Sequence, residues 1–418
     1  MKPGQIPILE FVIANIRWLF AGLFLSFLSS FGQTFFIAMF GGEIRAAFGL
    51  SNGAFGTLYM IGTLASAATL IWMGQLADVM RVRVLGSLTI IGLAIACMSM
   101  ASAAGYISLL LAIYLLRLTG QGMMSHVAVT AMARWFDAYR GRAIAFSVFG
   151  YPIGEAVFPT IAVLLTAWVG WRTSWLIVAG ALLVIGLPVF LLALRQRRIP
   201  GRSGEEPPAV DFPGMVHWTR IEVLSNPLVW LIFPCILAPA FIVTATFFHQ
   251  SYLAETKGWS LAFWAACYPL YAVTSVASTI VSGWGVDRWS GRQLLPFVCV
   301  PLGLGFLVLA IGNDPWVAVI GMALIGFSAG STNTIFGSVW PELYGTRHLG
   351  SSKALATAAM VFSSALGPGV MGVLIDAGVS LERQFLAMAV YCFAVSGLAI
   401  ALQGRMRLTQ PELYGFKP

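Results

Sequence analysis

Four ionisable side chains stand inside long apolar stretches of this sequence: Arg117, His126, Glu155 and His249. A charge in hydrocarbon is costly, so such residues are paired or functional, and intramembrane carboxylates often act as proton relays. Arg117 and Glu155 lie near the middles of consecutive apolar stretches, and we expect them to pair. The pair is either a permanent structural ion pair or one that breaks or takes up a proton during function, and we favour the second hypothesis.

The two histidines have different expected roles. His126 follows Arg117 by nine residues, on roughly the opposite face of a helix, and we interpret it as a packed, hydrogen-bonded residue. His249 closes the seventh apolar stretch. It either senses pH or gates the mouth of the protein, or it lies at the lipid headgroups without a role; the sequence favours neither hypothesis.

Further polar side chains recur at helical spacing. Serines and Gln33 form a stripe on the first apolar stretch, and Tyr268 and Tyr271 begin a stripe on the eighth. We expect the serines to pack helices together, and Gln33, Tyr268 and Tyr271 to face a cavity, because their polar tips need partners. Tyr59 is the counterpart of Tyr268 in an internal repeat, and Asn333 adds a neutral amide.

The elements that must hold these residues are membrane helices. The chain has 418 residues, of which 59% are hydrophobic and 10% charged, whereas a soluble domain has about 25% charged residues. Twelve apolar stretches are long enough to span a bilayer. They cover approximately residues 17–40, 53–76, 84–104, 106–132, 142–168, 173–194, 227–250, 260–284, 293–312, 315–340, 350–376 and 383–403.

The distribution of Lys and Arg predicts the orientation. With both termini in the cytoplasm, nineteen of the 24 Lys and Arg residues fall in cytoplasmic segments, four fall outside and Arg117 lies within a span. The net charge of +8 is therefore explained by a cell-membrane protein, and no nucleic-acid partner is needed.

The chain repeats itself. The loop from Gly74 to Arg83 has a Gly, an Asp four residues later (Asp78) and an Arg five residues after that, and the pattern returns 209 residues later. The second copy contains Gly283, Asp287, Arg288 and Arg292. Six spans in each copy predict two all-α bundles related as parallel repeats. The expected domains are an N-terminal six-helix bundle (1–194), a cytoplasmic linker (195–226) and a C-terminal six-helix bundle (227–418).

This combination resembles the major facilitator superfamily. The two loops and a fourth-span pattern, Arg117-x-x-Gly120-x-Gly122, carry the resemblance across nearly the whole chain. Val79 and Arg81 depart from the usual Arg and Gly of the first loop. Within the superfamily the chain is most similar to bacterial relatives of the monocarboxylate and oxalate/formate carriers, through the stretches 134–143 and 341–350. Those carriers often hold a basic residue in the eighth helix, and residues 262–283 contain none.

The two loops predict a gate. Asp78 and Asp287 follow the second and eighth spans, where a carboxylate can pair with Arg and meet a helix N-terminus. Such a network locks the cytoplasmic face while the protein is open outward. The gate set is Gly74, Asp78, Arg83, Gly283, Asp287, Arg288 and Arg292. The alternative is a charge cluster that only sets topology.

No enzyme motif is present, and we expect no cofactor and no metal site. Five scattered cysteines are interpreted as small core residues. Without a nucleotide-binding loop, the predicted function is secondary active transport of a small organic anion, such as a monocarboxylate, by a proton-coupled monomer. The predicted substrate and coupling set is Arg117, Glu155, Gln33, Tyr59, Tyr268, Tyr271, Asn333 and His249. The alternatives are efflux of an amphipathic compound and a membrane sensor that binds solute without moving it.

Overall fold

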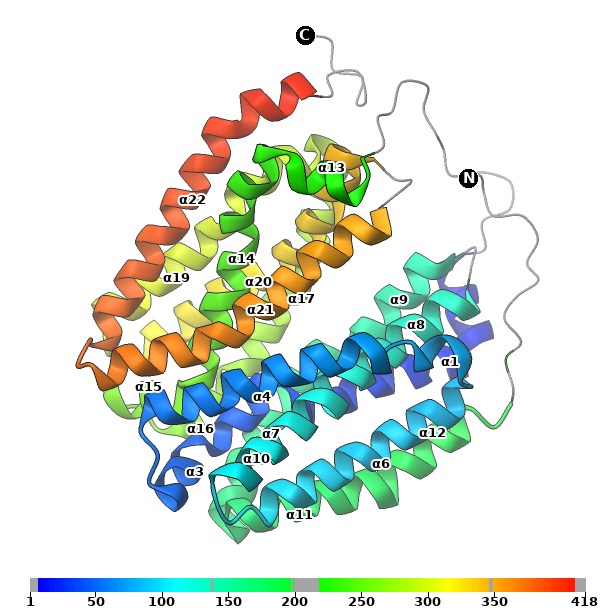
Figure 1. The fold of residues 1–418 in the computed structure, drawn as a ribbon, viewed down its shortest axis with the longest axis vertical. Coiled ribbons are helices and arrows are strands. Elements are labelled where there is room, and N and C mark those ends of the chain that lie inside the picture. The colour runs from blue at the N-terminus through cyan, green and yellow to red at the C-terminus, as the bar shows by residue number, and fades with distance from the viewer. Residues whose placement is uncertain (1–6, 137–138, 197, 199–217, 346–348, 410–418) are drawn as a thin grey trace. The chain divides into compact units, whose positions relative to one another are not determined.

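The computed structural model describes residues 7–136, 139–196, 198, 218–345 and 349–409, which are helical with no strand among them (Figure 1). Much of the expected linker and the ends of the chain lie outside the described residues. Twelve helical segments are long and apolar enough to span a membrane, which confirms the prediction. They are Ile8–Gly32, Asn52–Val79, Val82–Ala101, Tyr106–Trp135, Arg140–Val169, Trp171–Ala193, Pro227–Phe248, Leu261–Trp289, Gly291–Ile311, Pro315–Tyr344, Leu355–Asp376 and Leu381–Met406.

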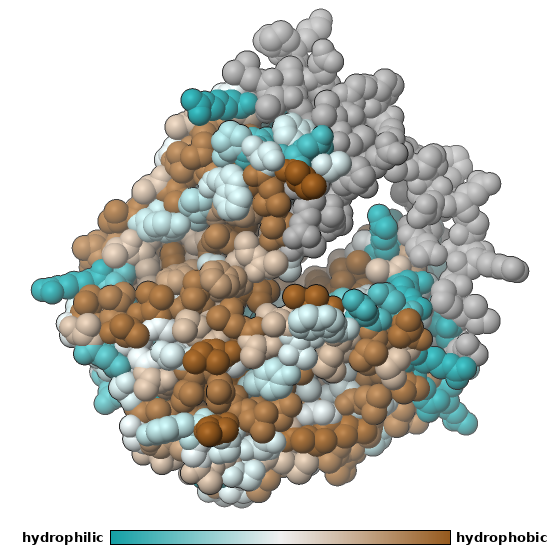
Figure 2. All heavy atoms as spheres, in the orientation of Figure 1, coloured by the Kyte–Doolittle hydropathy of each residue, from teal (hydrophilic) through white to brown (hydrophobic). Residues whose placement is uncertain are grey.

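Large apolar side chains point outward along these spans. Ile107 is 84% exposed and Trp168 81% exposed, and brown side chains cover most of the visible helix surface in Figure 2. In water such surface would drive association, but in a bilayer it is solvated by lipid, and the buried residues between helices pack by size and shape.

The helices divide into two compact units. The first comprises residues 1–40 and 61–206, and the second residues 41–60 and 207–418. Helix α4 (Asn52–Met73) therefore contributes its first nine residues to the second unit. The other helical elements of the first unit are α1 (Ile8–Leu28), η1 (Ser29–Gly32), α2 (Thr34–Ile37), η2 (Ala38–Phe40), α5 (Leu76–Val79), α6 (Val82–Ala101), α7 (Tyr106–Leu116), η3 (Arg117–Met124), α8 (Ser125–Trp135), α9 (Arg140–Val148), α10 (Gly150–Val169), α11 (Trp171–Ala181), η5 (Leu182–Gly186) and α12 (Leu187–Ala193).

In the second unit, α17 packs on α20, α14 on α21, and α19 on both α20 and α22. A short helix, α13, lies within the stretch expected to be a linker. The elements of this unit are α3 (Gly41–Phe48), α13 (Arg220–Ser225), α14 (Pro227–Phe248), α15 (Gln250–Thr256), α16 (Leu261–Ala266), α17 (Tyr268–Trp289), α18 (Gly291–Leu294), η6 (Leu295–Phe297), α19 (Cys299–Ile311), α20 (Pro315–Tyr344), α21 (Leu349–Asp376) and α22 (Leu381–Thr409).

The internal repeat is visible in the helix boundaries. Helix α8 ends at Trp135 and α20 at Tyr344, 209 residues later. Helix α6 begins at Val82 and α18 at Gly291, again 209 residues later. The sequence offset therefore identifies structurally equivalent positions in the two halves.

Candidate functional site

The apolar stretch expected to form the first span, residues 17–40, is not one continuous helix. It leaves α-helical geometry at Ser29–Gly32 and passes through Gln33, whose backbone is extended (φ −82°, ψ 154°), before α2 begins. Local competition explains the break, because the Ser29 hydroxyl donates to the Ser26 carbonyl at 2.7 Å and glycine is a poor helix former. Irregular backbone inside a membrane protein must be buried in protein or line a polar cavity.

Arg117 supports this break from the fourth span. Its guanidinium donates through Nη1 to the Gly32 carbonyl at 3.1 Å and to the Thr34 hydroxyl at 3.4 Å. The side chain is 2% exposed and begins the π-helical segment η3 (Arg117–Met124). Such segments are frequent at functional sites. A buried cation thus hydrogen-bonds to a backbone carbonyl at the break.

Very close packing holds the broken segment against the fourth span. A Cβ atom added at Gly32 would lie 2.2 Å from the Leu116 carbonyl oxygen and 2.6 Å from the Gly120 Cα. Only glycine allows the two backbones to approach this closely. This approach brings the Gly32 carbonyl within reach of the Arg117 guanidinium.

Glu155 lies on a helix that packs against the same break. It is half-buried on α10, which packs against η1 and α2, and the neighbouring Gly154 abuts the Ser30 hydroxyl. The ion pairs of the described residues do not include Arg117 with Glu155. In this conformation, the expected pairing is replaced by hydrogen bonds from Arg117 to the backbone and hydroxyl groups of the break.

A separate polar cluster lies in the second unit. The Gln250 side-chain oxygen accepts hydrogen bonds from the Tyr268 hydroxyl at 2.7 Å and the Trp264 indole at 3.1 Å. Gln250, Tyr268 and Trp264 have no exposed surface. The expectation that Tyr268 faces a cavity therefore differs from the structure, because Gln250 satisfies its polar tip inside the bundle. Tyr271, 5% exposed, packs its ring on Phe247.

The remaining expected substrate residues are dispersed. Tyr59 is fully buried against the Phe248 ring, with centroids 4.5 Å apart. Asn333 is exposed on α20, and Gln33 is half-buried at the break. Of the expected set, Gln33, Arg117 and Glu155 belong to the first unit, where η1 packs against both η3 and α10.

His249 lies inside the second unit, just after α14 ends. It is 3% exposed, and its Nε2 lies 2.9 Å from the Pro368 carbonyl oxygen. The pKa of His249 is lowered to about 4, mainly by burial. The hydrogen bond with Pro368 and the charge of Asp376 raise this pKa, and the positive charge of Arg45 lowers it. The side chain is therefore neutral across the physiological pH range and is buried inside the second unit. His126 is hydrogen-bonded, with its Nε2 3.0 Å from the Gly74 carbonyl oxygen.

The two repeated loops differ in how their charges are held. In the first loop, Asp78 and Arg83 are exposed, while Gly74 is buried. In the second loop, Asp287 and Arg288 are exposed, and Arg288 lies over the rings of Trp284 and Trp289. The described contacts do not test the predicted gate, which stays a prediction.

The carboxylate at a helix N-terminus is Glu342 and not Asp287. Its oxygens accept from the backbone N–H groups of Gly291 at 2.7 Å and Arg292 at 2.9 Å, and Arg292 Nε lies 3.6 Å from the same carboxylate. Glu342 is 5% exposed and Arg292 9% exposed. The sequence analysis used Glu342 only as part of a family resemblance, although an acid at the end of a spanning helix is itself a signal.

Sequence reasoning also missed the groups that surround its candidates. Gly32 and Thr34 were not singled out, although the run Ser-Ser-Phe-Gly before Gln33 is rich in poor helix formers. Asp376, which accepts from the Gly53 backbone N–H at 2.9 Å, was also missed. It meets the N-terminus of α4, where a carboxylate is favoured.

Two repeats of membrane-spanning helices are an architecture typical of membrane transporters. The sequence model of the Major Facilitator Superfamily matches residues 22–368. The chain belongs to this superfamily and is a multi-pass membrane transporter, not an enzyme.

Individual relatives are distant. An oxalate:formate antiporter of Oxalobacter formigenes is 25% identical over 313 residues, covering 71% of this chain and 70% of the relative. The uncharacterized MFS-type transporter YhhS of Escherichia coli O157:H7 is 24% identical over 299 residues, covering 71% and 64%. Two solved structures have a similar fold. A bacterial homologue of the human lysosomal transporter Spinster, in an inward-facing and occupied conformation, has a TM-score of 0.67 and 16% identity, covering 97% of this chain and 98% of that chain. The nucleoside transporter NupG has a TM-score of 0.69 and 14% identity, covering 92% of this chain and 98% of that chain.

Proposed function

We propose that this transporter moves a small organic anion, such as a monocarboxylate, by alternating access and with proton coupling. The observation that carries the proposal is Arg117, a cation buried at the break of the first span. Interrupted membrane helices recur at the substrate sites of secondary transporters.

The chemistry of Arg117 suits a carboxylate. A guanidinium has five N–H donors in a planar fork, and a carboxylate binds two of them side by side. The present partners of Arg117 include a backbone carbonyl and the Thr34 hydroxyl, both of which a substrate carboxylate can replace as acceptor. The half-buried Gln33 at the break adds a neutral donor.

One relative supports an anionic substrate without specifying it. The Oxalobacter formigenes relative is an oxalate:formate antiporter, which handles small carboxylates by its name. That relative exchanges two substrates, so exchange of two anions is the competing coupling mode. Proton coupling in this chain rests on Glu155, a half-buried carboxyl group next to the same break.

Transport in proteoliposomes tests the proposal. Radiolabelled formate, oxalate, acetate and lactate are offered with and without an imposed pH gradient, and we expect saturable uptake of at least one. Arg117→Lys keeps the charge but loses the fork, so we expect uptake of the same anion to fall at least about tenfold. The control, Arg140→Gln, changes an exposed arginine and should transport normally.

Two outcomes would contradict the proposal. Movement of a lipophilic cation with no carboxylate uptake would favour efflux of amphipathic compounds. Specific binding of a carboxylate without any uptake or counterflow would favour a sensor.

A further inference from the structure

Among the described residues, the first repeated loop has no counterpart of the acid that faces the second loop; Asp137 lies outside the described residues. In the second half, the Glu342 carboxylate covers the start of α18 and faces Arg292. The equivalent positions in the first half, 209 residues earlier, are Ala133 and Arg83. The residue after Ala133 is Arg134. This end of the first unit therefore has a base next to the position at which the second half has an acid.

A cavity of about 330 Å³ occupies this place. Five arginines contribute to its wall, and none of the described residues that line it is acidic. The lining residues are Val79, Met80, Arg81, Val82, Arg83, Arg134, Trp135, Leu194, Arg195, Gln196 and Arg198. The nearest acid along the chain, Asp78, is exposed and absent from the lining.

Two of the five arginines are held in place by the protein. Arg134 donates to the Ala77 carbonyl. Arg198 donates to the Trp135 carbonyl at 3.2 Å and to the Asn15 side chain at 2.8 Å, and its guanidinium lies 4.0 Å from the centre of the Phe136 ring. The wall is therefore built, and it does not consist only of mobile surface side chains.

The other three arginines of the cavity wall are exposed and can reach an anion. Arg81, Arg83 and Arg195 are all exposed. Arg81 is also the N-cap of α6 and makes no side-chain capping bond, so the first N–H groups of a 20-residue helix face this region without a carboxylate. Helix N-termini and arginine forks both favour phosphate oxygens.

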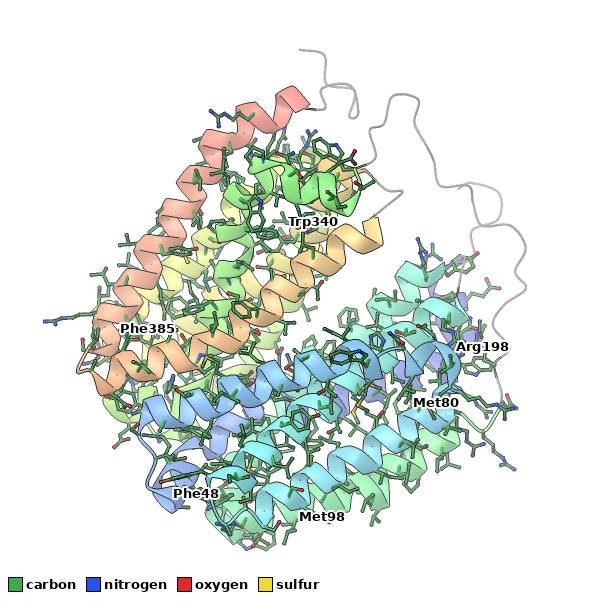
Figure 3. The ribbon with its side chains drawn as sticks, in the orientation of Figure 1. Phe48, Met80, Met98, Arg198, Trp340 and Phe385 are labelled. Atoms are coloured by element: carbon green, nitrogen blue, oxygen red, sulfur yellow. The ribbon has the colours of Figure 1, made fainter. Side chains whose placement is uncertain are left out.

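The rest of the surroundings is apolar and faces lipid. Val79 is 80% exposed in the cavity wall, and Ile71 and Trp72, on the preceding helix α4, are each 68% exposed. Figure 3 places Met80 and Arg198 at the same end of the first unit, where Figure 2 shows teal side chains beside brown ones. An occupant must therefore offer an anionic head and an apolar body.

We propose that this cavity binds the phosphate of an anionic glycerophospholipid, which takes the place that the Glu342 carboxylate occupies in the second half. Basic pockets between membrane helices bind such headgroups. The distribution of Lys and Arg predicts the cytoplasmic leaflet as the source. The lipid neutralises the arginines of the first loop and joins α5, α6, α8 and the end of α12.

Thermal stability of the purified protein in mild detergent tests the site. Phosphatidylglycerol is added, and phosphatidylcholine with the same acyl chains is the zwitterionic comparison. We expect phosphatidylglycerol to raise the midpoint of unfolding and phosphatidylcholine not to do so. In the variant Arg83→Gln with Arg195→Gln, half-saturation should need at least about tenfold more phosphatidylglycerol.

The matched control is Arg140→Gln with Arg405→Gln, which removes the same charge from exposed arginines outside the cavity and should bind as the native protein does. Equal loss in both double variants would overturn the site, because the effect would then follow net charge. Equal stabilisation by inorganic phosphate would overturn the lipid assignment and indicate a soluble anion.

A second variant, which adds an acid where the first removed bases, tests the site if the double variant does not fold. Ala133→Glu introduces the acid of the second half, and we expect it to abolish stabilisation by phosphatidylglycerol. Unchanged stabilisation in Ala133→Glu would overturn the proposal. If neither variant folds, the native protein still decides, because equal responses to phosphatidylglycerol and phosphatidylcholine exclude a headgroup site.

Discussion

Arg117 shows how a membrane protein can hold a buried charge without the partner that the sequence suggests. The guanidinium donates to the Gly32 carbonyl and the Thr34 hydroxyl, because the broken span leaves an acceptor that lipid cannot satisfy. Glu155 remains half-buried beside the same segment. The two residues therefore flank one break, and a rearrangement of that break changes the surroundings of both.

Glu155 is the residue on which proton coupling is predicted to depend. Glu155→Gln removes the titratable group and keeps a hydrogen-bonding side chain of similar size. We expect accumulation driven by a pH gradient to fall at least about tenfold, because no proton is exchanged. Counterflow should persist, since it needs binding and alternating access but no net proton movement. Both are measured in the same proteoliposomes.

The double variant Arg117→Gln with Glu155→Gln is the comparison. It removes both charges and avoids leaving one of them alone, which typically costs about 3–5 kcal/mol. Full accumulation by this variant would show that neither residue is the anion site or the proton relay.

His249 predicts a pH dependence of stability. Its pKa is about 4 in the folded protein and about 6.5 when exposed, so unfolding takes up a proton between these values. The contribution of neutral His249 is complete above about pH 6.5 and is lost as the pH falls towards 4; the full loss is of order ~3 kcal/mol. The midpoint of thermal unfolding, measured from pH 7.5 to 4.5, should fall more steeply in the native protein than in His249→Gln.

Arg45 and Asp376 are the charged groups that also act on His249. The comparison is made between pH 6.5 and 5.5, just below the pKa of an exposed histidine. Parallel curves for the two proteins in that interval would show that His249 does not control the effect.

At the scale of elements, the crossing of the first and fourth spans positions the site. Gly32→Ala places a methyl group 2.2 Å from the Leu116 carbonyl oxygen, so the backbones must separate and the bond from Arg117 lengthens. We expect a loss of about 1–3 kcal/mol in stability and a loss of transport. Thermal unfolding and anion uptake are measured together.

The control is Gly180→Ala on α11, where an added methyl group meets no atom within 4 Å. Replacing a helical glycine by alanine typically stabilises by about 0.5–1 kcal/mol, so this variant should be unchanged or slightly more stable. Normal stability and transport in Gly32→Ala would mean that the crossing is not needed for function.

At the scale of the whole molecule, the repeat is conserved in helix boundaries but not in charge. Helices α8 and α20 end at equivalent residues, yet one end carries Arg134 after Ala133 and the other carries Glu342. The two halves therefore share their helix boundaries but differ in which charged residues they carry. Arg117 and the basic cavity belong to the first unit, and Glu342 belongs to the second.

The orientation of the whole chain in the membrane is testable at Ser203, which lies outside the described residues. Ser203→Cys should react with an impermeant thiol reagent only after cells are opened, because the positive-inside rule places residues 195–226 in the cytoplasm. The five native cysteines are buried, and the native protein controls for their reaction. Labelling of Ser203→Cys in intact cells would reverse the orientation.

The twelve spans, the two repeats and the superfamily could all be predicted from the amino-acid sequence. A bilayer imposes a length and a composition on every spanning helix, so these properties are local and can be read along the chain. The repeat offset is equally local, and it identified Arg83 and Arg292 as equivalent before their surroundings were known.

The side-chain partners, in contrast, depend on how the helices pack. Arg117 reaches a carbonyl 85 residues away, Tyr268 is satisfied by Gln250, and Arg292 faces Glu342 where Arg83 faces other arginines. Hydropathy cannot distinguish these outcomes, because it reports how much of a helix is apolar and not which face a neighbour covers. The break at Gly32 depends on a backbone contact with the fourth span, and such a contact exists only once the helices have packed.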